Sequence, residues 1–273
     1  MLSKIKLALF SRPALTHTLT DCCTNMKQMV MYMGGHLPPE TIDWPWVEDS
    51  IYLEPTLQHV TFLNKSLSNM DRMHRLQTYY KFMIVRNPFE RIVSAYRDKL
   101  EHPVVHTPTK SEGFSNMIKK QILMRYRPAE LLYWETTAKE HLFNISVTFP
   151  EFVRYLIETN IEDRNEHFQP SMHICHPCLV GYDFYGNFKN YSEDAKQLIQ
   201  KFSTNPKFYQ NKSLHPVAHQ TNRKMARYYR TLSYRDKMQL LGAWYDELVF
   251  YYTLYPAEKD CHRKLLGISE PVL

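Results

Sequence analysis

The sequence predicts an α/β fold with a mainly parallel central sheet flanked by helices. Segments with strand and helix patterns alternate through the first two thirds of the chain, as expected for strands joined by helical crossovers. The 273 residues are 44% hydrophobic and show no compositional boundary, so one substantial core is expected. Only 7 Gly are present and the G-x-x-x-x-G-K-[ST] pattern is missing, which argues against a Gly-rich nucleotide loop.

The clearest local signal is a short strand followed directly by a helix. Residues 81–86 read Lys-Phe-Met-Ile-Val-Arg, an apolar segment of strand length. Asn87 can cap a helix, Pro88 suits the first helical position, and Glu90 completes a capping box. We therefore expect a helix from Pro88 to about Leu100.

Periodicity and capping residues predict the remaining elements. Ser233 followed by Asp236 is a capping signal for the last of the helices. The apolar stretch at residues 179–184 is expected to form a strand. The further helices are expected at residues 24–33, 114–125, 150–158, 192–202 and 233–251.

The formal net charge of +6 suits an anionic ligand, such as a nucleotide, a sulfated glycan or a nucleic acid. Residues 223–235 interleave five Lys or Arg with three Tyr, a pattern that is compatible with a polyanion-binding face. A solvated helix surface explains this stretch more simply, because basic helix faces are common.

The cysteine content argues against a disulfide scaffold, since five cysteines are few for this length. Cys175 and Cys178 form a Cys-His-Pro-Cys motif, but a redox pair of the thioredoxin type would need a βαβ context. A zinc site with His173 and His176 would lack the usual second pair of ligands. A structural disulfide or buried thiols are the preferred interpretation.

Signals for the compartment conflict. Four N-x-[ST] sequons favour a secretory chain with glycosylated loops. The apolar run at residues 5–10 is too short for a membrane span and poor as a signal peptide. We therefore expect either an anchor supplied by sequence missing here or a protein that is not secretory. The sequons are at Asn64, Asn144, Asn190 and Asn211.

The strand and helix around residue 86 suggest an anion site. The strand delivers Arg86 to the carboxyl edge of the sheet, where open α/β sheets bind ligands. The helix carries Ser94 two turns further on. An arginine fork, a hydroxyl donor and a helix amino terminus together can hold a phosphate, although such an arginine is often structural.

Residues 85–96 resemble the 3′-phosphate-binding motif of the Golgi carbohydrate sulfotransferases, a family that includes the chondroitin and dermatan 4-O-sulfotransferases. That motif typically reads Val-Arg-(Asp or Asn)-Pro-Phe-Glu-Arg-Leu-Val-Ser-Ala-Tyr, and it is almost unchanged here. Other family motifs follow in order, so the resemblance covers roughly residues 23–256. These further motifs are at residues 148–153, 167–170, 175–178, 182–184 and 244–255.

The resemblance implies a P-loop-kinase-like sulfotransferase fold, 3′-phosphoadenosine-5′-phosphosulfate as co-substrate, and no metal. It implies that Arg86 and Ser94 bind the 3′-phosphate of this donor, with Arg91 as a further contributor. His167 occupies a family motif position and is the candidate general base, because imidazole titrates near neutrality; a structural or acceptor-contact role is the alternative. The implied donor-binding residues of the amino-terminal loop are Cys23, Thr24, Asn25 and Lys27.

This amino-terminal loop departs from the family pattern. Where the family reads Pro-Lys-Val-(Gly or Ala)-Cys-Thr-Asn, this chain has Thr20, Asp21 and Cys22 before Cys-Thr-Asn. The missing cation would stabilise charge that develops on the leaving nucleotide, so we expect poor transfer by the chain as written. Residues 1–22 are interpreted as an atypical segment, for which a mis-assembled gene model is favoured over true decay, ahead of a single sulfotransferase-like domain at 23–273.

The leading hypothesis is transfer of a sulfuryl group to a glycan hydroxyl in the Golgi lumen. The acceptor is expected to be chondroitin- or dermatan-like, or to contain N-acetylgalactosamine, and the membrane is reached only through an anchor missing from this chain. The first alternative is a catalytically impaired lumenal module that binds a nucleotide or a glycan. The second is a nucleic-acid-binding protein that uses residues 223–235, although no nucleic-acid partner is expected.

Overall fold

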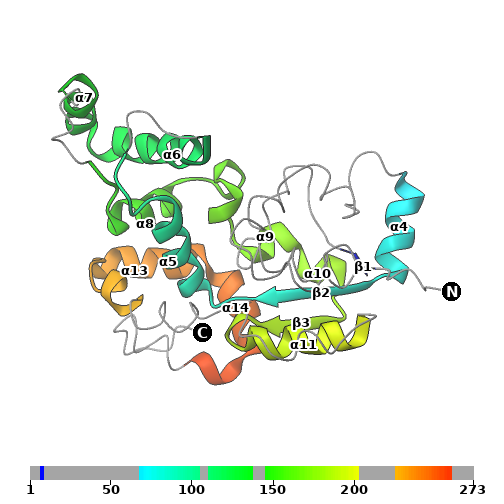
Figure 1. The fold of residues 1–273 in the computed structure, drawn as a ribbon. Coiled ribbons are helices and arrows are strands. Elements are labelled where there is room, and N and C mark those ends of the chain that lie inside the picture. Colours follow the sequence, from blue (N-terminus) through cyan, green and yellow to red (C-terminus); the bar gives the residue numbers. More distant parts are fainter. Residues whose placement is uncertain (1–6, 9–67, 105–109, 138–144, 203–224, 260–273) are drawn as a thin grey trace. The chain divides into compact units, whose positions relative to one another are not determined.

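The structure is a computed structural model, and it describes residues 7–8, 68–104, 110–137, 145–202 and 225–259 (Figure 1). The chain divides into two compact units. The sheet unit comprises the described parts of residues 1–87 and 171–218. The helical unit comprises the described parts of residues 88–170 and 219–273.

The sheet unit contains a parallel sheet whose described strands have the order β1-β2-β3. The strands are β1 (Leu7–Ala8), β2 (Tyr80–Val85) and β3 (Phe184–Asn187). Most of β2 is buried, as expected for a strand in a parallel sheet that is covered on both faces. The strand predicted at residues 81–86 is therefore confirmed with a shift of one residue, and Arg86 directly follows it.

Two local features hold β3 against β2. The Asp183 carboxylate accepts a hydrogen bond from the Lys81 backbone N–H at 2.7 Å, and this bond lowers the pKa of Asp183. Within β3, a Cβ atom on Gly186 would lie 2.5 Å from the Ile84 side chain, so a larger residue at this position would force that side chain to shift. Val85 then stands opposite Asn187 in the register.

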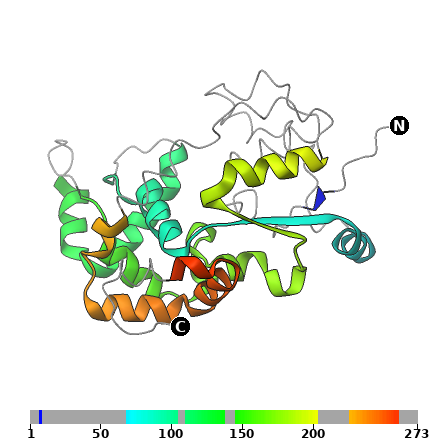
Figure 2. The same ribbon diagram turned by 90° about the horizontal axis from the view of Figure 1, so that it is seen from below.

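Helices complete the sheet unit. Helix α4 (Asn69–Thr78) precedes β2, and α11 (Tyr191–Phe202) packs along β3 (Figures 1 and 2). The helix predicted at residues 192–202 is thereby confirmed. The helix expected at residues 24–33 lies outside the described residues.

The strand predicted at residues 179–184 is wrong, because most of this stretch is not extended. Helix α9 (Ser171–Cys175) is followed by the short α10 (Pro177–Val180), and β3 starts only at Phe184. Pro177 occupies the first turn of α10, which its fixed φ favours. Gly181 ends that helix in the left-handed conformation with φ 60°, where glycine is unstrained.

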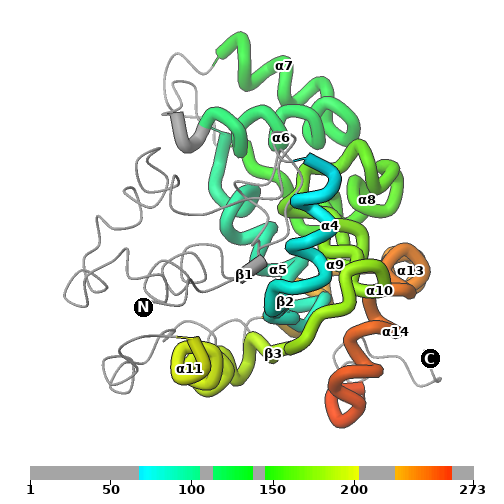
Figure 3. The backbone as a smooth tube through the Cα atoms, turned by 90° about the vertical axis from the view of Figure 1, so that its right-hand side faces the viewer, coloured from blue at the N-terminus to red at the C-terminus, as the bar shows by residue number. Residues whose placement is uncertain are grey.

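The helical unit is built around α5 and α8, with α6 and α7 lying side by side (Figures 1 and 3). The helices predicted at residues 88–100, 114–125 and 150–158 are confirmed with small differences at their ends. The bounds are α5 (Pro88–Lys99), α6 (Lys110–Tyr126), α7 (Pro128–Thr137), α8 (Phe149–Glu158), α13 (Tyr234–Ala243), α14 (Tyr245–Leu254), and the 3₁₀ turns η3 (Ile161–Asp163), η4 (Glu166–Phe168) and η7 (Pro256–Glu258).

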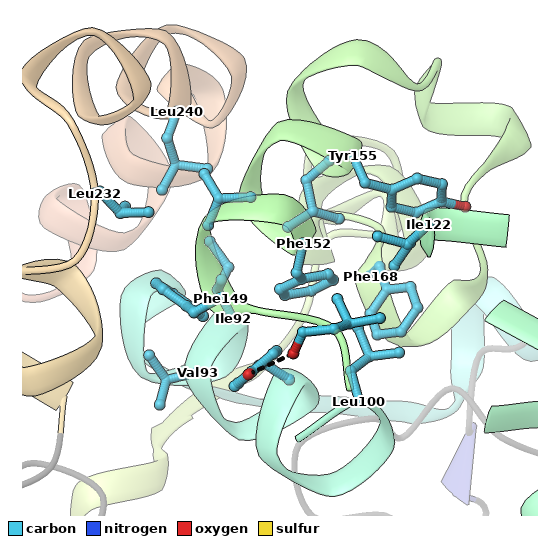
Figure 4. Packing of buried hydrophobic residues seen from close by; sticks show 14 of the residues in the cluster. Ile92, Val93, Leu100, Ile122, Phe149, Phe152, Tyr155, Phe168, Leu232 and Leu240 are labelled. Atoms are coloured by element: carbon cyan, nitrogen blue, oxygen red, sulfur yellow. Dashed lines mark hydrogen bonds between the residues drawn. The ribbon is translucent and has the colours of Figure 1, made fainter. Parts of the chain in front are cut away.

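Aromatic rings fill the core of the helical unit (Figure 4). The Tyr96 ring centroid lies 5.2 Å from that of Phe149, and the Phe152 centroid lies 5.1 Å from that of Phe168. The Tyr96 hydroxyl donates to the Val147 carbonyl at 2.9 Å, so its polar group is satisfied inside the core. Burial raises the pKa of Tyr96 to about 12. Phe89, Ile92 and Val93 of α5 are buried beside Tyr96, so this face of the helix is a core face.

Helix α8 begins with a complete capping box. The Thr148 side chain accepts from the Glu151 N–H, and the Glu151 carboxylate accepts from the Thr148 N–H at 2.7 Å. The same buried carboxylate receives Arg127, with Nε to Oε1 at 2.7 Å. Glu151 thus links the start of α8 to the connection between α6 and α7.

We expect Glu151→Ala to lower the free energy of unfolding by about 2–3 kcal/mol, because the helix cap is lost and Arg127 loses the more buried of its two carboxylate partners. Glu158→Gln on the same helix is the matched control, since that carboxylate is 49% exposed. Its effect should stay within about 0.5 kcal/mol. Urea denaturation measures both values, and equal effects would contradict the structural role of Glu151.

The prediction of a single helix at residues 233–251 is wrong, because this stretch forms two helices, α13 and α14. The backbone of Trp244, with φ −112° and ψ 16°, separates α13 from α14. Gly242 weakens the helix just before this break. The Trp244 ring is buried, and the guanidinium carbon of Arg164 lies 4.8 Å from its centroid. The predicted cap is confirmed, because the Ser233 side chain accepts from the Asp236 N–H at 3.0 Å.

Candidate active site

Arg86 lies at the carboxyl end of β2 in the sheet unit. Its side chain is buried, with 5% of the residue exposed. The guanidinium carbon is 4.3 Å from the ring centroid of Phe188, the first residue after β3. Because Val85 pairs with Asn187 in the register, Arg86 and Phe188 leave two adjacent parallel strands at the same edge. This explains how residues so distant in sequence form a cation–π contact.

The turn after β3 is also well ordered by hydrogen bonds. The Asn187 N–H donates to Asp194 in α11 at 2.6 Å, and the Asn187 side chain accepts from the Lys189 N–H at 2.9 Å. Burial raises the pKa of Asp194, although the hydrogen bond from Asn187 opposes the shift. Phe188 is therefore held in place beneath the Arg86 guanidinium. The result is a buried, oriented arginine at the edge of a parallel sheet.

Helix α5 carries the other candidate donor residues, and it belongs to the helical unit. Ser94 is half-buried, while 4% of Arg91 is exposed. Arg91 donates from Nη1 to the Gln169 carbonyl, next to the turn that contains His167. The start of α5 is held by the Tyr229 hydroxyl, which donates to the Phe89 carbonyl at 3.1 Å. The hydrogen bond from Arg91 to the Gln169 carbonyl joins α5 to the loop after η4.

His167 lies in the 3₁₀ turn η4 and is half-buried. Its Nδ1 atom is 2.5 Å from the Oδ1 atom of Asn165, which also accepts from the His167 backbone N–H at 3.0 Å. The Phe114 ring lies 5.9 Å from the imidazole, measured between centroids. Sequence reasoning did not single out Asn165, although an Asn two residues before a candidate base is a visible signal.

The structure thus brings Arg91 and the segment of His167 together within the helical unit, whereas Arg86 belongs to the sheet unit. The donor-binding roles of Arg86, Arg91 and Ser94 remain predictions. The amino-terminal loop candidates lie outside the described residues. These are Cys23, Thr24, Asn25 and Lys27.

The preferred interpretation of the Cys-His-Pro-Cys motif is wrong. Neither Cys175 nor Cys178 forms a disulfide, and Cys178 is exposed rather than buried. Cys175 ends α9, and the left-handed backbone of His176, with φ 44°, turns the chain into α10. Across the described part of the chain, no three His, Cys, Asp or Glu side chains are grouped so as to hold a metal ion.

The basic and aromatic stretch at residues 223–235 is partly built into the helical core. Tyr229 is fully buried, and Tyr228 donates its hydroxyl to Glu101. Two of the three tyrosines in this stretch therefore serve internal contacts instead of stacking on bases. Arg227, Arg230 and Arg235 are exposed, as the simpler interpretation of a solvated surface predicts.

None of the helices in the described ranges has the length and apolar character needed to cross a membrane.

The features above define an α/β protein with a small parallel sheet, many helices and a buried arginine where a central strand ends. The chain belongs to the sulfotransferase family, because the profile of that family matches residues 22–253. The match includes β2, α5 and the turn that carries His167. No solved structure gives a significant match to the chain.

Several carbohydrate sulfotransferases are similar to this chain. Carbohydrate sulfotransferase 8 of Homo sapiens is 32% identical over 240 residues, which are 85% of this chain and 51% of that protein. Carbohydrate sulfotransferase 14 of Mus musculus is 37% identical over 181 residues, which are 65% of this chain and 41% of that protein. Carbohydrate sulfotransferase 11 of Mus musculus is 32% identical over 184 residues, which are 65% of this chain and 47% of that protein. The chain spans about half the length of the curated relatives it matches.

Proposed function

We propose that the protein transfers a sulfuryl group from 3′-phosphoadenosine-5′-phosphosulfate to a hydroxyl group of a glycan. The family match across residues 22–253 carries this proposal, together with the carbohydrate sulfotransferases among the relatives. The P-loop-kinase-like sulfotransferase fold is part of the proposal. The small parallel sheet is compatible with it.

Arg86 and Ser94 hold the 3′-phosphate of the donor in this proposal. A buried guanidinium that is already oriented by the Phe188 ring fits a phosphate, because little side-chain entropy remains to be lost on binding. The Ser94 hydroxyl supplies a neutral donor. Arg91 contributes mainly through its hydrogen bond to the Gln169 carbonyl. Cys23, Thr24, Asn25 and Lys27 belong to the loop for the 5′-phosphosulfate.

His167 acts as the general base. The donor supplies an activated sulfuryl group, and the acceptor oxygen attacks its sulfur while the bond to the 5′-phosphate oxygen breaks. His167 accepts the hydroxyl proton at Nε2, so the proton passes to the imidazole and the nucleotide leaves with the electron pair. The reaction is a direct displacement and needs no covalent bond to the protein or metal ion.

The acceptor is a chondroitin- or dermatan-like glycan, or another glycan that contains N-acetylgalactosamine. The similarity to carbohydrate sulfotransferases supports a carbohydrate acceptor, and the basic character of the chain suits an acidic polymer. The proposed site of action is the Golgi lumen, reached through an anchor outside the matched region. Exposed Asn190, in one of the four sequons, is available for glycosylation in that compartment.

The direct test is transfer of labelled sulfate from the donor to desulfated chondroitin, dermatan and N-acetylgalactosamine-terminated oligosaccharides. Calorimetric titration with the desulfated product, 3′-phosphoadenosine-5′-phosphate, accompanies the assay. Transfer to any of these acceptors supports the proposal. Product binding without transfer would indicate the non-catalytic binding module instead.

The same assay tests the unusual amino-terminal loop. We expect the triple variant Thr20→Lys, Asp21→Val, Cys22→Gly to transfer sulfate at least roughly tenfold faster than the unmodified chain, because a cation replaces a carboxylate near the leaving group. The loop also retains Lys27, and Lys27→Ala in the triple variant is the matched control that separates its contribution from that of the new lysine at position 20. Strong activity in the unmodified chain would show that the interpretation of the loop is wrong.

A further inference from the structure

Asn165 makes three hydrogen-bonding contacts around His167. Its Oδ1 atom accepts from the His167 backbone N–H at 3.0 Å and lies 2.5 Å from the His167 Nδ1 atom. Its Nδ2 atom donates to the Glu166 carboxylate at 2.8 Å. Both ends of the amide group are therefore used, and each end has a defined partner.

These contacts determine which imidazole nitrogen carries the proton. An ionised carboxylate only accepts hydrogen bonds, so Glu166 requires the NH₂ end of the Asn165 amide to face it. The carbonyl end then faces His167, and a carbonyl oxygen also only accepts. The His167 Nδ1 atom must therefore donate. In neutral imidazole the other nitrogen, Nε2, then carries the lone pair.

We propose that Asn165, oriented by Glu166, is the positioning residue that holds His167 as the Nδ1–H tautomer with Nε2 as the proton acceptor. This inference rests on the proposed function, because it specifies how the general base is prepared. A general base needs the lone pair on the nitrogen that meets the acceptor hydroxyl. The wrong tautomer would present an N–H to that hydroxyl and could not remove its proton.

The surroundings of the turn limit other arrangements. Phe168 is buried in the core next to Phe152, which anchors the residue after His167. Gln169 donates from Nε2 to the Arg164 carbonyl at 2.8 Å and accepts from Arg91 through its own carbonyl. The backbone on both sides of the imidazole is thereby held. The contact of Nδ1 with the Asn165 side chain then favours one tautomer of the imidazole.

Asn165 also caps the 3₁₀ turn, and a capping role alone would account for its bond to the His167 backbone. Capping does not require the contact with Nδ1. The variants Asn165→Ser and Asn165→Asp separate the two roles. Serine retains a capping oxygen on a shorter side chain, whereas aspartate retains both the cap and an acceptor that reaches Nδ1.

The deciding measurement is the tautomer of His167, read from the nitrogen chemical shifts of the full chain labelled with ¹⁵N-histidine. His167→Gln identifies the signal among the 13 histidines. We expect the Nδ1–H form in the unmodified protein and in Asn165→Asp. Asn165→Ala and Asn165→Ser should instead show substantial Nε2–H form. A fixed Nδ1–H tautomer in all four proteins would overturn the inference.

Turnover provides the second measurement. We expect Asn165→Ala and Asn165→Ser to lower kcat by roughly 10- to 100-fold, with Asn165→Asp recovering most of the loss and product affinity staying within about twofold in all variants. Parallel loss of folding and turnover in Asn165→Ala, with Asn165→Ser fully active, would assign capping alone and overturn the inference. An unmodified protein without transfer activity would count against the proposed function, while the nitrogen shifts would still decide the role of Asn165.

Discussion

Replacing His167 with alanine is expected to lower sulfuryl transfer by roughly a hundredfold or more, because the acceptor hydroxyl loses the group that takes its proton. Affinity for the desulfated donor product should stay near that of the unmodified protein. His167→Gln is the sharper variant, since its amide retains hydrogen-bonding capacity but does not act as a base. Steady-state turnover and calorimetric titration measure the two effects separately.

His102→Ala is the matched control for this prediction. His102 is an exposed histidine of the same helical unit, and its replacement should leave turnover within about twofold, as expected for a surface change away from special features. Thermal unfolding checks that the His167 variants remain folded. A folded, fully active His167→Ala protein would remove this residue from the catalytic machinery.

Local sequence signals predicted the elements around the candidate site. The strand before Arg86 and helix α5 follow from an apolar run and a proline at the first helical position. Helix α8 has similarly strong local signals, and the structure shows its complete capping box. The box predicted from Asn87 and Glu90 for α5 stays a prediction. Such elements are predictable because residues close in sequence determine where each helix starts.

Other elements depend on contacts that a sequence pattern does not show. Residues 179–184 are apolar enough for a strand, but Pro177 and Gly181 impose a short helix. The last helix breaks at Trp244, whose ring is buried against Arg164. Tyr229 lies in a basic stretch that suggests a surface, yet its ring is in the core. In each case tertiary packing or a turn decides between alternatives that periodicity leaves equal.

The candidate site shows the same division. Arg86 was predictable from its place at a strand end, whereas the Phe188 ring that orients it comes from the end of another strand. His167 was predictable as a motif position, whereas the contacts of Asn165 and Arg91 that hold its turn required coordinates. Sequence therefore indicates which chemical groups are present. The structure adds how two of them are oriented before any ligand binds.

Arg86 offers the clearest test of donor binding. Arg86→Ala should weaken binding of 3′-phosphoadenosine-5′-phosphate by about 2 kcal/mol or more, because a charged hydrogen-bonding partner of a phosphate is lost from a buried position. Arg86→Lys retains the charge but lacks the planar fork that stacks on Phe188, so we expect a smaller but clear loss. Both affinities are measured by calorimetric titration of folded protein, with thermal unfolding as the check on folding.

A ligand without the 3′-phosphate makes this test specific. Adenosine 5′-monophosphate should bind the unmodified protein and Arg86→Ala with similar affinity, because only the 3′-phosphate reaches Arg86 in the proposed site. Arg97→Ala on α5 serves as the protein control: its guanidinium lies 3.6 Å from Glu101 in a partly exposed pair, and its removal should change product binding by less than about 0.5 kcal/mol. If Arg86→Ala is folded and binds the product normally, or if it weakens both nucleotides equally, Arg86 does not hold the 3′-phosphate and its role is to pack the sheet edge against Phe188.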